Sequence, residues 1–254
     1  MTHPHTLSTS NGDTDLRAPS SISRSNHTRT ATSMLVIAAL CMLAPLALAH
    51  GVTGGDQAFL EQNAGRNLIV FAYLGAKHMV TGYDHLLFLF GVVFFLYRIR
   101  DVGIYVTLFA IGHSITLLAG VLGGWHVNAY LIDAIIGVSV VYKALDNLGA
   151  YKRWFGVQPD TKAAVLIFGL FHGLGLATKL QDFALSRDGL MPNMLAFNVG
   201  VEIGQLLALA GILIAMGFWR RSRNFNRHAF AANIVLMTAG FVLIGYQLTG
   251  FFVS

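Results

Sequence analysis

Six long apolar runs constrain this chain more than any other feature of its sequence. They cover about residues 68–97, 103–122, 129–148, 163–180, 191–218 and 229–252. Each is near the roughly 20 residues that a helix needs to cross the hydrocarbon core of a bilayer. Only 11% of the residues are charged, against about a quarter in a typical soluble domain. The sequence therefore predicts an all-α, polytopic membrane bundle of about six transmembrane helices.

The N-terminal part of the chain has a different composition. Residues 1–33 are polar and rich in Ser, Thr and Asn, and this composition predicts a disordered leader. The apolar segment 34–49 follows two arginines and ends in Ala47-Leu48-Ala49, which is typical of a signal peptide, or of a signal anchor that stays uncleaved. Cleavage would leave His50 as the mature N-terminus, and residues 50–254 would form the transmembrane domain.

The positions of Lys and Arg predict how the helices are oriented. The basic residues of three loops fall on one side of the expected bundle. They are Arg98, Arg100, Lys152, Arg153, Lys162, Arg220, Arg221, Arg223 and Arg227. Basic residues in short loops favour the cytoplasmic side. We therefore expect a multi-pass protein of the bacterial inner membrane with the mature N-terminus and the C-terminus outside. The net charge of +5 follows from this topology, so the expected partner is the lipid bilayer and not nucleic acid.

Ionisable side chains inside the apolar runs are costly to bury, so they indicate a functional site. The helical rise places several of them at similar depth, in the outer half of the membrane. We therefore expect one polar cavity that opens outward. The candidate metal ligands are His78, Asp84, His85, His113, His172 and Glu202. The polar residues expected to support them are Ser114, Asp133, Asn198 and Gln205.

Residue spacing adds detail to this expectation. Asn198, Glu202 and Gln205 follow an i, i+4, i+7 pattern, which places them on one face of a helix. The motifs Gly169-x3-Gly173 and Gly200-x3-Gly204 predict that helix backbones approach closely. The first apolar run is longer than a bilayer requires, so it could begin as a surface helix that Gly75 or Gly82 redirects. His78 and His85 would share a face only if the helix ran unbroken through Gly82.

The donor types indicate a transition metal. Imidazoles with carboxylates suit nickel, zinc or cobalt, and the only cysteine, Cys41, lies in the N-terminal segment. A carboxylate beside a ligating histidine fixes its tautomer, and Asp84 could serve His78 or His113 in this way. Any one of these histidines could instead make a packing hydrogen bond, but the burial of the whole set favours a site.

Four ordered motifs resemble those of one family of membrane proteins. They are Gly75-Ala-Lys-His78 to Gly82-Tyr-Asp84-His85, Gly112-His113-Ser114, Phe168-Gly-Leu-Phe-His172-Gly and Phe197-Asn198-x3-Glu202. This pattern is similar to the HupE/UreJ family. The resemblance implies a nickel permease or metal carrier that accompanies hydrogenase or urease. Leu176 and Lys179 stand where the nickel-associated members carry a second His and a Glu, so the chain resembles a broader branch of the family.

Three functions fit these observations. The first is a permease for a divalent, nickel-like metal. The second is a membrane-embedded zinc-type metalloenzyme of hydrolase type, with Glu202 or Asp84 as base and Ser114 orienting the substrate. The third is a metal-binding accessory protein for a periplasmic metalloprotein. Tyr142, Lys143 and Asp146 could form an inner gate or only an internal ion pair. The sequence has no ATP-binding loop, so any transport would be secondary or would depend on other subunits.

Overall fold

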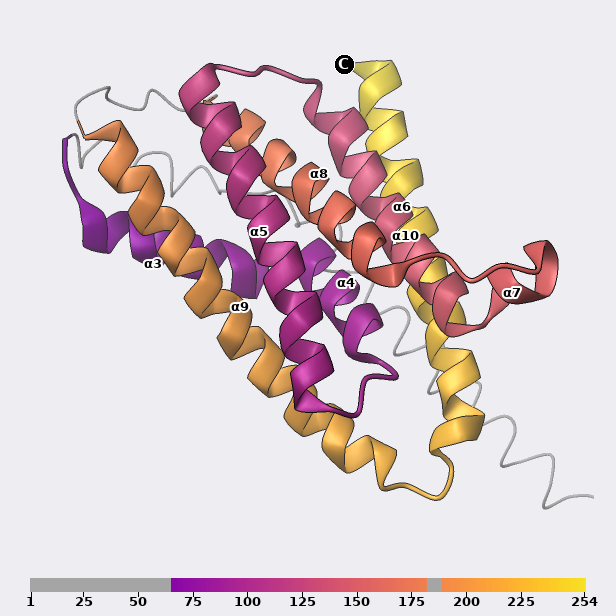
Figure 1. Ribbon diagram of the computed structural model, residues 1–254. Coiled ribbons are helices and arrows are strands. Elements are labelled where there is room, and N and C mark those ends of the chain that lie inside the picture. Colours follow the sequence, from indigo (N-terminus) through magenta and orange to yellow (C-terminus); the bar gives the residue numbers. More distant parts are fainter. Residues whose placement is uncertain (1–64, 182–188) are drawn as a thin grey trace, which may run out of the picture. The chain divides into compact units, whose positions relative to one another are not determined.

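The computed structural model describes residues 65–181 and 189–254 (Figure 1). Within these residues the regular structure is helical and no strand occurs. The helices are α3 (Leu68–Thr81), α4 (Tyr83–Val93), α5 (Ile99–Gly123), α6 (Ala129–Asn147), α7 (Ala150–Phe155), α8 (Thr161–Gln181), α9 (Leu190–Arg220) and α10 (Phe225–Val253). The expectations for residues 1–33, for segment 34–49 and for His50 lie outside the described residues.

Four of these helices, α5, α8, α9 and α10, are long and apolar enough to cross a membrane. Large apolar side chains on α9, such as Leu207 and Phe218, are exposed, as suits helices that face lipid. The expected number of about six spans is not confirmed. The first run is divided into two helices of 14 and 11 residues, and the 19-residue α6 carries three charged residues, Asp133, Lys143 and Asp146. The all-α membrane class is confirmed.

The first apolar run is divided at Gly82. This residue takes an extended conformation with φ −72° and ψ 102°, and its N–H donates to the carbonyl of His78 at 2.8 Å. α3 therefore ends at Thr81 and α4 begins at Tyr83. The first run is therefore a pair of short helices that is redirected at Gly82, which is one of the two glycines considered from the sequence.

α5 and α8 form a closely packed pair because glycines remove side chains from their contact. A Cβ atom on Gly169 would lie 2.5 Å from the carbonyl oxygen of Phe109, and one on Gly173 would overlap the carbonyl of His113. These distances are shorter than van der Waals contact, so only glycine fits. The prediction made from this small-x3-small motif is confirmed.

α3 and α9 form a second pair through the other glycine motif. A Cβ on Gly204 would lie 2.6 Å from the carbonyl oxygen of Ala76, and one on Gly200 would overlap the carbonyl of Ala72. α6 and α10 form a third pair. Because α4 also packs against α6, the break at Gly82 lies where the α3–α9 pair joins the other helices.

A polar network ties the C-terminal half of α6 to its neighbours. Lys143 Nζ lies 2.5 Å from Asp146, whose carboxylate also accepts a hydrogen bond from Gln158. Asn147 Nδ2 donates to the carbonyl of Gly91 on α4 at 2.9 Å. The internal ion pair between Lys143 and Asp146 is thus present. It lies among polar contacts that join α6 to Gln158 and to α4.

Candidate functional site: a buried histidine cluster

Four imidazole rings from four helices meet around His85. The ring centroid of His85 on α4 lies 5.0 Å from that of His78 on α3, 5.9 Å from that of His113 on α5 and 4.9 Å from that of His172 on α8. His85, His113 and His172 have exposed fractions of 3%, 1% and 1%. The structure therefore brings together all four histidines that the sequence selected. We call them the histidine cluster.

The break at Gly82 is part of how the cluster forms. The helix is broken, so His78 and His85 do not share a face of one helix, and yet their ring centroids lie 5.0 Å apart. The change of backbone direction at Gly82 turns α4 so that its first turn faces the last turn of α3. Sequence spacing alone could not reveal this, since it assumes one continuous helical period.

Asp84 holds the ring of His85. Its Oδ1 accepts a hydrogen bond from the backbone N–H of His85 and lies 2.9 Å from the ring Nδ1. Because a carboxylate can only accept here, the ring carries a proton on Nδ1, and Nε2 is the nitrogen left to face another group. Asp84 thus pairs with His85, and not with His78 or His113 as the sequence suggested.

His172 is oriented in a similar way by the backbone. Its Nδ1 donates to the carbonyl of Phe168 at 2.7 Å, which leaves a lone pair on Nε2. The described part of the chain offers no hydrogen-bond partner to the buried Nε2 atoms of His78, His85 and His172, or to either ring nitrogen of His113. Buried nitrogens without partners are uncommon in folded proteins. A cation between the rings would satisfy them.

The spacing of the rings can be compared with that around a metal. Imidazoles bound tetrahedrally at about 2.1 Å from one ion have centroids about 5 Å apart. The pairs that His85 makes with His78 and His172 match this value, and the pair with His113 is wider. As placed, no three His, Cys, Asp or Glu side chains in residues 65–181 and 189–254 form a group that could hold a metal. The rings are close enough, but their nitrogens do not converge on one point.

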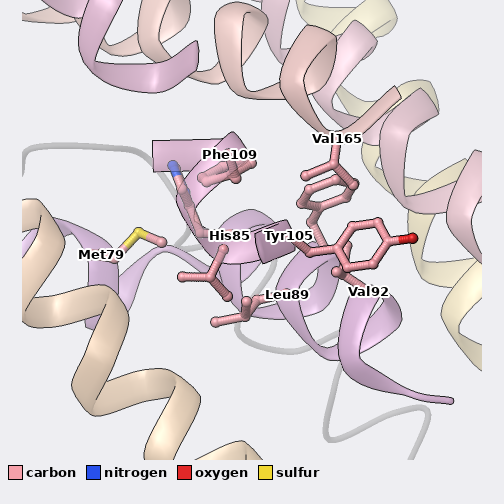
Figure 2. A pocket seen from close by; sticks show the side chains of 9 residues that line it. Met79, His85, Leu89, Val92, Tyr105, Phe109 and Val165 are labelled. Carbon is pink, nitrogen blue, oxygen red and sulfur yellow. The ribbon is translucent and has the colours of Figure 1, made fainter. Parts of the chain in front are cut away.

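Aromatic and aliphatic side chains close the space beside His85. Phe88 and Phe109 pack on the ring of His172 with centroids 5.5 Å and 4.9 Å away. Figure 2 shows His85 among Met79, Leu89 and Phe109 in a small apolar pocket. The pocket has a volume of about 10 Å³, which is room for one water at most. Phe88 thus contacts the histidine cluster through His172.

Glu202 does not join the histidine cluster. It is exposed, and it lines a groove between α5 and α9 together with Ser114, Asn198 and Gln205. None of the four histidines lines this groove. The residues expected in a single cavity therefore lie apart, the histidines in the cluster and Glu202 with its polar neighbours in the α5–α9 groove. The reason is that consecutive helical residues differ by about 100° in direction, so His113 and Ser114 face different sides of α5.

Asp133 lies in a third place. Its carboxylate accepts from Lys179 Nζ at 2.7 and 3.0 Å, across the contact of α6 with α8. Sequence reasoning missed this pair because the partners are 46 residues apart. The available signal was Lys179 itself, which is a charge inside an apolar run and so requires a partner.

The family described as HupE / UreJ protein matches residues 54–254. The chain belongs to the HupE/UreJ family. The matched region contains the histidine cluster and the α5–α9 groove. The comparisons found no match to a curated protein and none to a solved structure. Membership of the HupE/UreJ family indicates a membrane protein with a metal-related accessory or transport role.

Proposed function

We propose that this HupE/UreJ protein is a permease for a divalent, nickel-like transition metal, which it binds as substrate in the histidine cluster. The observation that carries the proposal is the set of five buried imidazole nitrogens that have no hydrogen-bond partner in the described part of the chain. Neutral imidazoles suit nickel, cobalt and zinc. In this proposal the protein lies in the inner membrane and receives the ion from outside.

The four histidines would have different tasks. The ring of His85 is held by Asp84 and that of His172 by the carbonyl of Phe168. Their Nε2 atoms would therefore be metal ligands with fixed positions. His113 has neither ring nitrogen engaged. Rotation of the His113 ring would therefore bring the nitrogens together when an ion enters. Asp84 supplies a negative charge behind His85 that offsets part of the charge of a divalent ion.

Two features support movement of the ion and not only its capture. Transporters commonly build their substrate sites at discontinuous membrane helices, and the α3–α4 break lies between two of the proposed ligands. The second feature is the apolar pocket beside His85. Hydrophobic constrictions of this kind act as gates because they exclude water. Its residues Leu89 and Val92 would have to separate before the ion could leave past Tyr105.

The metalloenzyme alternative has less support. Glu202 and Ser114, the residues considered as base and as substrate-positioning group, line the α5–α9 groove and not the histidine cluster. Asp84 remains a candidate base, but its Oδ1 is engaged by His85. The third alternative, an accessory protein that passes metal to a periplasmic metalloprotein, would use the same histidines without moving the ion across the membrane.

Metal analysis and uptake separate these functions. Purified protein would be loaded with nickel, cobalt or zinc, and its metal content measured beside His85→Ala, His113→Ala and the control His228→Ala, whose histidine is exposed on α10. The same proteins in liposomes would be tested for uptake. Binding and uptake that both fail only in the cluster variants would support the permease. Binding without uptake would support the accessory protein, and equal metal content in all variants would remove the site.

A further inference from the structure

The groove between α5 and α9 has a chemistry of its own. It has a volume of about 460 Å³, and the polar residues that line it are Thr107, Ser114, Asn198, Glu202 and Gln205. The other lining residues are apolar, and Glu202 is the only charged one. The histidine cluster contributes nothing to this groove, so its role must be sought separately.

Each of the two amide groups of the groove donates one N–H to α5. Asn198 Nδ2 donates to Ser114 Oγ at 2.8 Å, and Gln205 Nε2 donates to the carbonyl of Val106 at 3.2 Å. The Oδ1 of Asn198 is buried and has no partner in the part of the chain that the structure describes. Among the described residues, the groove thus holds two acceptors without a partner, the Oδ1 of Asn198 and the carboxylate of Glu202, beside the hydroxyl groups of Ser114 and Thr107.

Glu202 lies one helical turn from Asn198, so the two side chains share a face of α9. Within residues 65–181 and 189–254 it makes no hydrogen bond or ion pair. It is the only acidic residue of α9, about 18 Å along the helix from Leu190 at about 1.5 Å per residue. A carboxylate at such a depth in an apolar helix is costly without a compensating charge.

We propose that the α5–α9 groove binds a monovalent hard cation, with sodium as its probe, between the carboxylate of Glu202 and the Oδ1 of Asn198. Oxygen donors favour hard cations, whereas transition metals prefer imidazole or thiolate. One carboxylate balances one positive charge, and a divalent ion would leave the groove charged. Ser114 positions the amide of Asn198 by accepting its N–H.

Ser114 of the groove follows His113 of the histidine cluster on α5, and the two side chains face different sides of that helix. An ion bound in the groove would therefore act on His113 through the backbone of α5. Coupling between the two sites rests on the proposed function. Binding of sodium in the groove does not, because the groove uses none of the proposed transition-metal ligands.

Equilibrium binding of radioactive sodium to the purified full-length protein tests this proposal. Choline would keep the ionic strength constant and a chelator would remove transition metals. We expect saturable binding that Glu202→Gln abolishes and that Asn198→Leu weakens about tenfold or more, because one charge–dipole contact is lost. The control Asp101→Asn, which removes a carboxylate at the start of α5, should bind like the wild type. His85→Ala should also bind sodium. Loss of the transition-metal site can therefore be distinguished from loss of the sodium site.

A second measurement uses the unmodified sequence, so it does not depend on how the variants fold. A hydrophobic carbodiimide should label Glu202, and sodium should protect it while choline does not, as read by mass spectrometry. Protection by sodium supports the site. Labelling that responds to pH but not to sodium, or sodium binding that is equal in wild type and Glu202→Gln, would overturn it.

Discussion

Asp84 and His85 are neighbours in the chain, and the Oδ1 of the first lies 2.9 Å from the ring Nδ1 of the second. The same oxygen accepts the backbone N–H of His85, so the carboxylate is fixed in the first turn of α4. A negative charge is also favourable at a helix N-terminus. The ring of His85 is therefore oriented before any ion arrives.

Replacement of Asp84 should weaken metal binding without unfolding the protein. Asp84→Asn keeps the size of the side chain but removes the charge that fixes the tautomer of His85. We expect about a 10- to 100-fold loss of nickel affinity, as is usual for such supporting carboxylates, measured by competition with a chelating dye. Asp101→Asn is the matched control. Equal affinities in Asp84→Asn and wild type would show that His85 does not act through Asp84.

Gly173→Ala should destabilise the contact of α5 with α8. The added methyl group would overlap the carbonyl of His113, and overpacking of this kind costs about 1–3 kcal/mol. Thermal unfolding in detergent should show a lower midpoint. Gly217→Ala on α9 is the control, because a Cβ there meets no atom within 4 Å. Similar midpoints for the two variants would contradict the close approach.

The Lys179–Asp133 pair should behave as a coupled unit. Lys179→Met leaves a largely buried carboxylate without its partner, and we expect a loss of stability of about 1–3 kcal/mol. Asp133→Asn in the same protein should restore part of it. A double-mutant cycle on unfolding free energies measures the coupling. A coupling energy near zero would show that the ion pair contributes nothing to stability.

Arg220 should secure the end of α4. Its Nη2 donates to the carbonyls of Val93 and Phe94, and its guanidinium lies 4.6 Å from the ring centroid of Tyr97. Lysine cannot reproduce this planar contact. Arg220→Lys should lower stability by about 1 kcal/mol, measured by thermal unfolding. Arg221→Lys, a neighbouring exposed arginine, should unfold like the wild type.

Composition and spacing predicted the helical membrane class and the glycine contacts, because both depend on local sequence. They also selected the four histidines that meet. The depth of a residue follows from its position along a helix. The direction in which it points around the bundle depends on how neighbouring helices pack, and no spacing reveals that. Glu202 was therefore expected in one cavity with the histidines, whereas it lines the α5–α9 groove.

The sequence left the break at Gly82 undecided for a related reason. A glycine inside an apolar run is compatible with a continuous helix and with a break. What decides between them is packing: α3 lies against α9, while α4 lies against α6. These are tertiary contacts between residues far apart in the chain.

That break has a mechanical consequence. The histidines on either side of it belong to helices with different packing partners, and they are joined through a single extended residue. The φ and ψ angles of Gly82 therefore determine how far apart the rings of His78 and His85 lie, and so the geometry of any chelate that they would form. Any displacement of α9 relative to α6 would therefore change the distance between the rings of His78 and His85.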